Sequence, residues 1–191
     1  MGGIGAGKSA VGGILEGMGA VRIDADSIAR QVLERTEIIS QIAREFGEGV
    51  LEDGRVSRPK LAAVAFTDES LVKKLNAIVH PAVITESRRI IREARRESAC
   101  KAIILDAPLL VEAGLEGLCD YLVFVDAAEE KRQKRLEESR GWDAGEIGRR
   151  ERFQNSLISK RKRADYIVDN NGSLDETVRQ IASIWNKIVN A

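Results

Sequence analysis

Residues Gly2 to Ser9 read Gly-Gly-Ile-Gly-Ala-Gly-Lys-Ser, which fits the pattern G-x-x-x-x-G-K-[ST]. Glycines at these positions let successive backbone N–H groups point inward at the α- and β-phosphates of a nucleotide. The side chain of Lys8 would reach the β- and γ-phosphates, and the hydroxyl group of Ser9 would ligate Mg²⁺. The segment therefore predicts binding of a nucleoside triphosphate together with magnesium.

The residues on the two sides of this loop give different indications. Ala10 to Met18 can form a helix whose amino terminus would add its dipole to the anion site. A buried strand should precede such a loop, yet only Met1 stands there, so we expect the first central strand to be missing from this chain and to lie upstream. An ordinary glycine-rich turn is the alternative interpretation of the pattern.

Composition narrows the class of protein. The chain has 191 residues, of which 43% are hydrophobic, and this length suits one buried core with an inserted lobe. Thirty basic residues balance thirty acidic ones, so no nucleic-acid or membrane-surface partner is predicted. Cys100 and Cys119 lack metal-site or disulfide spacing, which favours a reducing, cytoplasmic location. No apolar run approaches the ~20 residues that cross a bilayer, and the sequence does not predict an oligomeric state.

Short β-branched runs alternate with helical patterns, which predicts an α/β fold with a mainly parallel sheet flanked by helices. Three of the predicted strands end in an aspartate or are directly followed by one, namely Asp24, Asp106 and Asp126. Side chains there either face the ligand edge of the sheet or cap the next helix, and for Asp126 we expect the cap. The predicted strands, each expected to be buried on both faces, are Val21–Asp24, Ala102–Leu105, Tyr121–Val125 and Tyr166–Val168.

Two segments interrupt the α/β pattern. Residues 27–101 show helical periodicity without a strand, and we expect them to form a helical lobe that binds the phosphate acceptor. Residues 129–163 are rich in arginine, which suits a helical lid over a transferring phosphate, although a solvated helix is the alternative for most of these arginines. The nucleotide-binding core would then consist of residues 1–26, 102–128 and 164–191. Ser173 to Glu176 form a capping box that opens a final helix.

A phosphate loop alone is compatible with an ATPase, a GTPase or a kinase. The run Asp24-Ala25-Asp26 favours a kinase, which transfers a phosphoryl group to an acceptor. One carboxylate could take the proton of an attacking hydroxyl group while the other faces packing or Mg²⁺. The guanine-reading pattern N-K-x-D is absent, because Asn186 and Lys187 are followed by Ile and Val, and this argues against a signalling GTPase.

Several motifs together resemble the dephospho-coenzyme A kinase family, which has the P-loop NTPase type of sheet. The resemblance covers nearly the whole chain, in order and with similar spacing. It rests on Gly2–Ser9, Ile23–Arg30 (IDADSIAR), Asn76–Pro81 (NAIVHP), Pro108–Leu115 (PLLVEAGL) and Asp169–Ser173 (DNNGS).

The resemblance implies transfer of the γ-phosphoryl group of ATP to the ribose 3′-hydroxyl group of dephospho-coenzyme A, the last step of coenzyme A synthesis. Asp26 matches the general base proposed for the family, Lys8 and Ser9 match its phosphate-loop residues, and Arg140 matches an arginine of its lid. Arg30 would face charged groups of the acceptor.

The same resemblance assigns further contacts. Gly3, Gly5, Ala6, Gly7 and Ala10 would surround the phosphates together with Lys8 and Ser9, and Gln154 and Asn170 match positions near the nucleotide. His80, Pro108, Leu109 and Glu112 would lie on the acceptor side. Asp106 is expected near magnesium because of its position directly after the apolar strand Ala102–Leu105. From the residues alone, His80 before Pro81 is equally a structural group at a helix boundary, and Glu112 is equally a salt-bridged loop residue.

Two other functions stay open at the level of sequence. The first is another small P-loop kinase that acts on a nucleoside, a nucleotide or a small alcohol. The second is an inactive binder of nucleotide or coenzyme A, since family members carry a short apolar strand ending in Leu-Thr before the Gly-Gly and this chain has Met1 in the place of the threonine. Lys8, Ser9 and Asp26 favour the enzyme.

Overall fold

The computed structural model describes residues 1–96, 100–107, 110–143, 145 and 156–190. Residue contacts divide the chain into two compact units. The first unit consists of Met1–Ile23 and Ile91–Ala191, and the second consists of Asp24–Ile90. Among the described residues, no helix has the length and apolar character needed to span a membrane.

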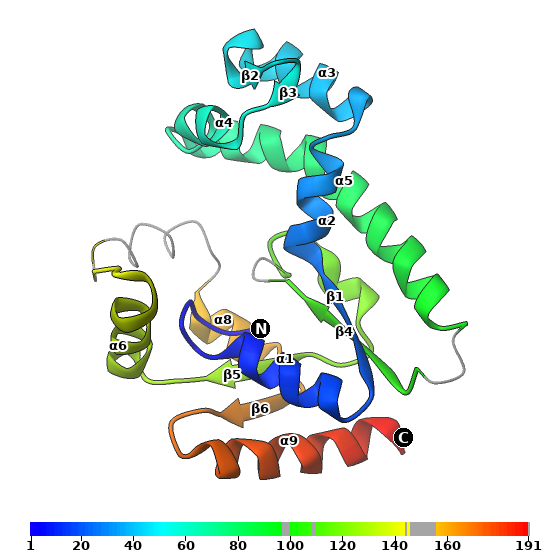
Figure 1. Cartoon of the computed structure of the whole chain (residues 1–191), viewed down its shortest axis with the longest axis vertical. Helices are drawn as coiled ribbons and strands as arrows, with labels where there is room; N and C mark the ends of the chain where they lie inside the picture. Colours follow the sequence, from blue (N-terminus) through cyan, green and yellow to red (C-terminus); the bar gives the residue numbers. More distant parts are fainter. Residues whose placement is uncertain (97–99, 108–109, 144, 146–155, 191) are drawn as a thin grey trace. The chain divides into compact units, whose positions relative to one another are not determined.

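The first unit contains the glycine-rich loop and the elements around it (Figure 1). Its helices are α1 (Lys8–Gly17), the short 3₁₀ helix η2 (Leu115–Leu118), α6 (Glu129–Arg140), α8 (Leu157–Lys162) and α9 (Leu174–Val189). Its strands are β1 (Ala20–Asp24), β4 (Ala102–Asp106), β5 (Val123–Asp126) and β6 (Tyr166–Asp169). The predicted helix after the loop and the four predicted strands are thus present, with ends shifted by one or two residues.

The described strands of this unit form two pairs. β5 pairs in parallel with β6, in a register that runs from Val123 opposite Tyr166 to Asp126 opposite Asp169. β1 lies beside β4 in the other pair. Helices flank these strands, so the predicted α/β class is confirmed.

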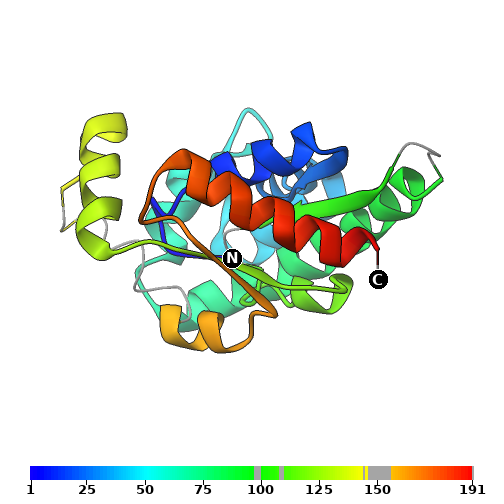
Figure 2. The ribbon, with the colours of Figure 1, turned by 90° about the horizontal axis from the view of Figure 1, so that it is seen from below.

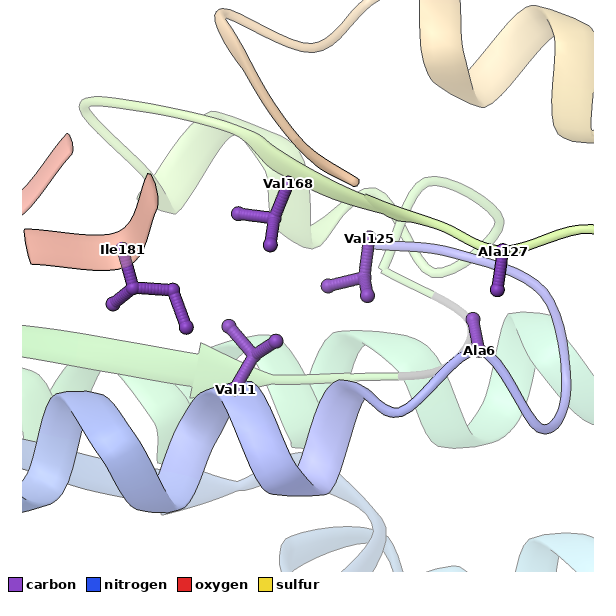
Figure 3. Packing of buried hydrophobic residues seen from close by; sticks show 6 residues of the cluster. All are labelled: Ala6, Val11, Val125, Ala127, Val168 and Ile181. Atoms are coloured by element: carbon purple, nitrogen blue, oxygen red, sulfur yellow. The ribbon is translucent and has the colours of Figure 1, made fainter. Parts of the chain in front are cut away.

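The core of the first unit lies between β5, β6 and two helices. α1 and α9 run side by side, as the blue and red helices of Figure 2 show. Their inward side chains, Val11 and Ile181, meet Val125 and Val168 of the strands (Figure 3), and each is at most 4% exposed. Ala6 of the loop belongs to the same cluster, so packing of the core and placement of the loop are linked.

Local sequence accounts for the start of α9. The Ser173 hydroxyl group accepts a hydrogen bond from the backbone N–H of Glu176, and the Glu176 carboxylate accepts one from the N–H of Ser173. This reciprocal capping box satisfies two N–H groups that the first helical turn leaves without helical partners. The predicted capping box is confirmed.

The second unit is mainly helical but contains a hairpin. Its helices are α2 (Ala25–Val32), α3 (Thr36–Phe46), the 3₁₀ helix η1 (Glu48–Val50), α4 (Arg58–Ala65) and the larger part of α5 (Glu69–Ala94). β2 (Leu51–Glu52) and β3 (Arg55–Val56) pair antiparallel. The turn between them is Asp53-Gly54, with φ of 50° and 74°, as a two-residue hairpin turn requires. The expectation that residues 27–101 hold no strand is therefore wrong.

The helix boundary expected at His80 is also wrong. α5 continues through Pro81 for 26 residues in all. A proline inside a helix removes one backbone hydrogen bond, but the remaining bonds of so long a helix keep it continuous. The Thr85 hydroxyl group donates to the Pro81 carbonyl at 2.8 Å, which gives the kink-prone turn an additional bond.

A charged cluster ties α5 to the start of α3 within the second unit. The Arg35 guanidinium donates to the Glu86 carboxylate at 2.5 Å, and Arg89 donates to it at 2.6 Å. These hydrogen bonds hold the pKa of Glu86 below its ordinary value, with the bond from Arg89 contributing most and that from Arg35 next. The Glu86 side chain is only 14% exposed, so the two arginines stabilise a largely buried carboxylate.

Two expectations about strand residues are corrected. Asp126 does not cap α6, because the helix begins after Ala128, whose N–H donates to the Asn171 side chain, while Asp126 pairs with Arg161 at 3.2 Å. β4 is not buried on both faces, since all five of its residues are of intermediate exposure. The reason for the second difference is a cavity that β4 lines.

Candidate nucleotide-binding site

The glycine-rich loop adopts a conformation that depends on its glycines. Gly5 and Gly7 have φ of 77° and 95°, values that residues with a side chain rarely adopt. A Cβ atom on Gly5 would lie 2.8 Å from the Arg132 carbonyl oxygen and 2.9 Å from Leu136, and one on Gly7 would collide with the Asn170 amide group. The loop therefore needs glycine both for its backbone and for its close approach to neighbouring elements.

The carbonyl groups at the start of the loop face side-chain donors. Lys8 Nζ donates to the carbonyl oxygens of Gly2 at 3.0 Å and Gly3 at 2.8 Å. Arg132 of α6, which is 6% exposed, donates to the Ile4 carbonyl oxygen at 3.1 Å. The N–H of Ala6 donates back to the Gly3 carbonyl at 3.2 Å and closes a turn.

The second half of the loop is held from α6 and from the turn after β6. Arg135 donates to the Gly5 and Ala6 carbonyl oxygens at 3.5 and 3.4 Å and to the Asn170 carbonyl at 3.0 Å. Asn170 Nδ2 donates to the Ala6 carbonyl at 2.8 Å. The buried Thr177 hydroxyl group donates to Asn170 Oδ1 at 3.1 Å and fixes the orientation of the amide. Three elements distant in sequence thus hold one loop.

The loop leads directly into the amino terminus of α1. Gly7 is the residue before the helix, and it supplies no side-chain cap. Ser9 and Ala10 lie exposed in the first turn. A helix amino terminus carries partial positive charge and N–H groups without helical partners, which favours binding of phosphate there. The geometry of Lys8, Ser9 and the helix start therefore suits the phosphates of a nucleotide.

The residues expected to approach magnesium have suitable donor atoms. Ser9 offers a hydroxyl oxygen, and Asp106 at the end of β4 offers a half-buried carboxylate that also pairs with Arg22. No cluster of three metal-binding side chains occurs among the described residues. Magnesium bound to a nucleotide needs only one or two protein oxygens besides phosphate and water, so the donor set fits this ion.

The aspartate pair lies at the start of α2 in the second unit. The Asp24 carboxylate caps the helix by accepting hydrogen bonds from the N–H groups of Asp26 and Ser27 at 2.9 and 3.2 Å. Asp26 and Arg30 stand four residues apart on this helix and are both exposed, so they share one face. The structure thus gives the two carboxylates different environments, with Asp24 engaged in capping and Asp26 on the surface.

Glu112 forms an ion pair with Lys160 of α8, with 2.8 Å between Nζ and Oε1. The Lys160 side chain is only 2% exposed and that of Glu112 is 12% exposed. This pair agrees with the interpretation of Glu112 as a salt-bridged loop residue. A second ion pair joins Glu116 to Arg163, the residue after α8, with 2.7 Å between Oε1 and Nη1.

The remaining predicted residues are placed as follows. His80 lies half-buried within α5 of the second unit. Arg140 is the last residue of α6, and its guanidinium lies 4.8 Å from the centre of the Trp142 ring, a distance typical of a cation–π contact. Pro108, Leu109 and Gln154 lie outside the described residues.

The sequence did not single out Arg132 and Arg135, which bind the loop carbonyls. They stand three residues apart in α6 and so share a face of the helix. Nothing in their spacing separates them from the other arginines of 129–163. One feature of the sequence could have indicated them. They lie in the first turns of the helix that follows β5, at the edge of the sheet where the phosphate loop was expected.

Comparison with known proteins identifies the family. Residues 1–176 match the family model described as dephospho-CoA kinase, where CoA is coenzyme A. A dephospho-CoA kinase of Corynebacterium diphtheriae is 40% identical over 188 residues, which cover 97% of this chain and 94% of that protein. One from Geobacillus kaustophilus is 40% identical over 185 residues, covering 96% and 92%.

Solved structures agree with the fold. The crystal structure of TT1252 from Thermus thermophilus has a TM-score of 0.79 and 34% sequence identity, and the match covers 96% of this chain and 92% of that one. A dephospho-CoA kinase from Campylobacter jejuni, 22% identical, has a TM-score of 0.72 over 99% and 94% of the two chains. The predicted P-loop fold is thus confirmed. Because the family match and the sequence identities extend over nearly its whole length, this chain belongs to the dephospho-CoA kinase family.

Proposed function

We propose that this chain transfers the γ-phosphoryl group of ATP to the ribose 3′-hydroxyl group of dephospho-CoA, which gives CoA and ADP. One observation supports the proposal most directly. The phosphate loop is held by hydrogen bonds such as that from Asn170 to the Ala6 carbonyl, it places Lys8 and Ser9 at the start of α1, and it occurs in a chain of this family. The reaction belongs in the cytoplasm, where ATP is available.

The nucleotide half of the reaction rests on the first unit. The loop N–H groups and the start of α1 bind the phosphates of ATP, and the Lys8 ammonium neutralises charge on the β- and γ-phosphates. On binding, Lys8 exchanges its hydrogen bonds to the Gly2 and Gly3 carbonyls for bonds to phosphate oxygens. Ser9 and Asp106 would hold Mg²⁺, which supplies charge stabilisation of the phosphates.

The acceptor half rests on residues that were assigned by resemblance. Asp26 accepts the proton of the 3′-hydroxyl group, and Arg30 on the same face of α2 binds an anionic group of dephospho-CoA. Asp26 is exposed at the surface, so its carboxylate is accessible to the substrate. Arg140 stabilises negative charge on the transferring phosphoryl group. His80 and Glu112 contribute to the acceptor side, and Asn170 to the nucleotide side.

The test is magnesium-dependent phosphorylation of dephospho-CoA by purified protein, followed as formation of CoA and ADP. Asp26→Asn should lower kcat by ~10²-fold or more with little change in the KM for ATP, since a positioned base contributes about that factor. Asp24→Asn is the matched control, because asparagine caps a helix as well as aspartate does.

Three kinds of result would overturn parts of the assignment. A loss of only a few-fold in kcat for Asp26→Asn, or an equal loss for Asp24→Asn, would remove Asp26 as the proton acceptor. Phosphorylation of nucleosides or nucleoside monophosphates, with none of dephospho-CoA, would replace the proposed acceptor. Binding of ATP without transfer to any acceptor would leave the chain as a binder only.

A further inference from the structure

Arg22 lies in the middle of β1, between the apolar residues Val21 and Ile23, and its side chain is only 26% exposed. A charged group that is largely withdrawn from water needs a partner of opposite charge. The main partner of Arg22 is Asp106 at the end of the neighbouring strand β4, because Nη2 donates a hydrogen bond to Oδ2. The Asp106 side chain is itself only 19% exposed. The two residues therefore form a partly buried ion pair between two strands.

The guanidinium group of Arg22 also lies against helix α1. Gly12 of this helix is buried, and a Cβ atom there would be 3.3 Å from both Cζ and Nε of Arg22. That distance is shorter than an ordinary van der Waals contact, so the glycine leaves the space in which the guanidinium fits. One turn further along the helix, Glu16 forms a second ion pair with Nη1 at 3.5 Å. Arg22 thus connects α1 with the carboxylate at the end of β4.

This connection relates Asp106 to the phosphate loop. Ser9 stands three residues before Gly12 in α1, so the two residues share one face of the helix. Arg22 touches this face at Gly12 and holds Asp106 by its other nitrogen atoms. Asp106 is therefore held near the face of α1 that carries Ser9, the other residue expected to approach magnesium.

One N–H group of Arg22 lacks a hydrogen bond. Nε is buried, and within the described part of the chain no acceptor lies in reach of it. A buried donor without a partner costs free energy, and such a group in a folded protein requires an explanation. An apolar side chain at this position would avoid that cost. Stability alone therefore does not account for an arginine here.

We propose that Arg22 is a positioning residue for the metal site, which holds Asp106 by one carboxylate oxygen so that the other can face the Mg²⁺ of the bound nucleotide. The inference rests on the proposed function, in which Ser9 and Asp106 hold this ion. Carboxylates that bind a metal are themselves held by hydrogen bonds, and loss of such a partner typically weakens metal binding or activity by ~10–100-fold. Since Nη2 bonds to Oδ2, Oδ1 is the atom that can reach the ion or one of its water ligands.

The charge of Arg22 acts on metal binding in the opposite direction. A guanidinium beside a metal ligand repels a cation, so its removal would strengthen Mg²⁺ binding if charge alone mattered. Loss of the hydrogen bond that orients Asp106 would weaken it. The two effects differ in sign, and the proposal requires the loss of orientation to be the larger one.

The experiment measures the Kd for ATP by calorimetry, once with excess Mg²⁺ and once with EDTA, without any acceptor. Arg22→Met should raise the Kd measured with Mg²⁺ by about ten-fold and leave the Kd in EDTA unchanged. A merely structural role of Arg22 would change both values, because it would disturb the phosphate loop itself. Arg22→Lys, which keeps the charge and a donor, should recover most of the loss. Glu16→Gln is the matched control, since it removes only the second ion pair of Arg22 and should change neither value.

A second variant displaces Arg22 without removing any charge. Gly12→Ala places a methyl group against the guanidinium, while alanine is a better helix former than glycine and so preserves the fold. It should weaken binding of ATP with Mg²⁺, by less than Arg22→Met does, and should not lower the urea midpoint. Gly13→Ala, where no atom lies near the added methyl group, is its control.

A Kd with Mg²⁺ that falls or stays unchanged in Arg22→Met would overturn the proposal, and so would an equal rise with and without the metal. A further loss on adding Arg22→Met to a chain that already carries Asp106→Asn would also overturn it, because Arg22 acts through Asp106. None of these measurements involves the acceptor. Transfer to an acceptor other than dephospho-CoA would therefore refute the proposed function and leave this inference in place.

Discussion

Substitution of Gly7 tests how the phosphate loop is held. Gly7→Ala places a methyl group at φ of 95° and against the Asn170 amide, closer than the 3.0 Å below which real Cβ contacts essentially never fall. The left-handed backbone costs about 1–2 kcal/mol for alanine. Displacing Asn170 forfeits its bonds to Ala6 and Thr177, about 1 kcal/mol each when partly replaced by water. The free energy of unfolding should fall by about 2–4 kcal/mol.

A double-mutant cycle separates the two causes. Asn170→Ala alone should cost about 1–2 kcal/mol through its lost hydrogen bonds. In the Gly7→Ala background, Asn170→Ala should leave the free energy of unfolding almost unchanged, because the methyl group has already displaced the amide. The coupling energy should then equal the loss of stability caused by Asn170→Ala alone. Urea unfolding followed by tryptophan fluorescence measures stability, and calorimetry measures the Kd for ATP.

Gly13→Ala is the matched control. Gly13 lies in α1 with no atom near the position of a Cβ, so alanine there should stabilise the helix by up to about 1 kcal/mol and leave ATP binding unchanged. Additive losses in the cycle, or an unchanged affinity for ATP in Gly7→Ala, would refute the reasoning that Asn170 and the Gly7 backbone form one unit.

Three further predictions concern packing and charge. Lys160→Met should lower the free energy of unfolding by about 3–5 kcal/mol, since it removes one partner of a buried ion pair; a loss below 1 kcal/mol in urea unfolding would contradict this. Glu86, whose folded pKa is depressed, contributes stability above its unfolded pKa of 4.5 and loses it as pH falls through the folded value. Glu86→Gln should therefore flatten the acid limb of a pH–stability curve, and an unchanged limb would argue against its pairing with two arginines. Ile181→Ala should lower the free energy of unfolding by about 2–5 kcal/mol, because it leaves a void between α9 and the strands. A calorimetric Tm unchanged from the parent would contradict this, since it would mean that neighbouring side chains fill the void without loss of stability.

The fold was predictable where local chemistry determines it. The glycine pattern, the capping box of Ser173 and Glu176 and the apolar strand runs each correspond to an observed element. The hairpin was missed because its strands have two residues each, too short for a pattern of alternation. Pro81 was misread as a boundary, since local propensity ignores the bonds that a long helix retains around one proline.

The candidate site was predictable only in part, for a different physical reason. Lys8, Ser9 and the glycines form a contiguous motif, and their types alone indicate a phosphate ligand. Asp126 was expected to cap a helix, but its partner Arg161 lies on another element. The ion pair of Glu112 with Lys160 likewise joins residues 48 positions apart in sequence, so its formation depends on the fold.

The loop illustrates why a motif needs its distant partners. In a planar trans peptide the carbonyl group and the next N–H point in opposite directions. Arg132 fixes the carbonyl of Ile4, and Asn170 fixes that of Ala6. The N–H groups of Gly5 and Gly7 must then point away from these donors, toward the side on which an anion can bind. Side chains distant in sequence therefore orient the backbone groups of the loop, and replacing Arg132 by Met should weaken ATP binding, as a higher Kd in calorimetry, even though Lys8 and the glycines remain.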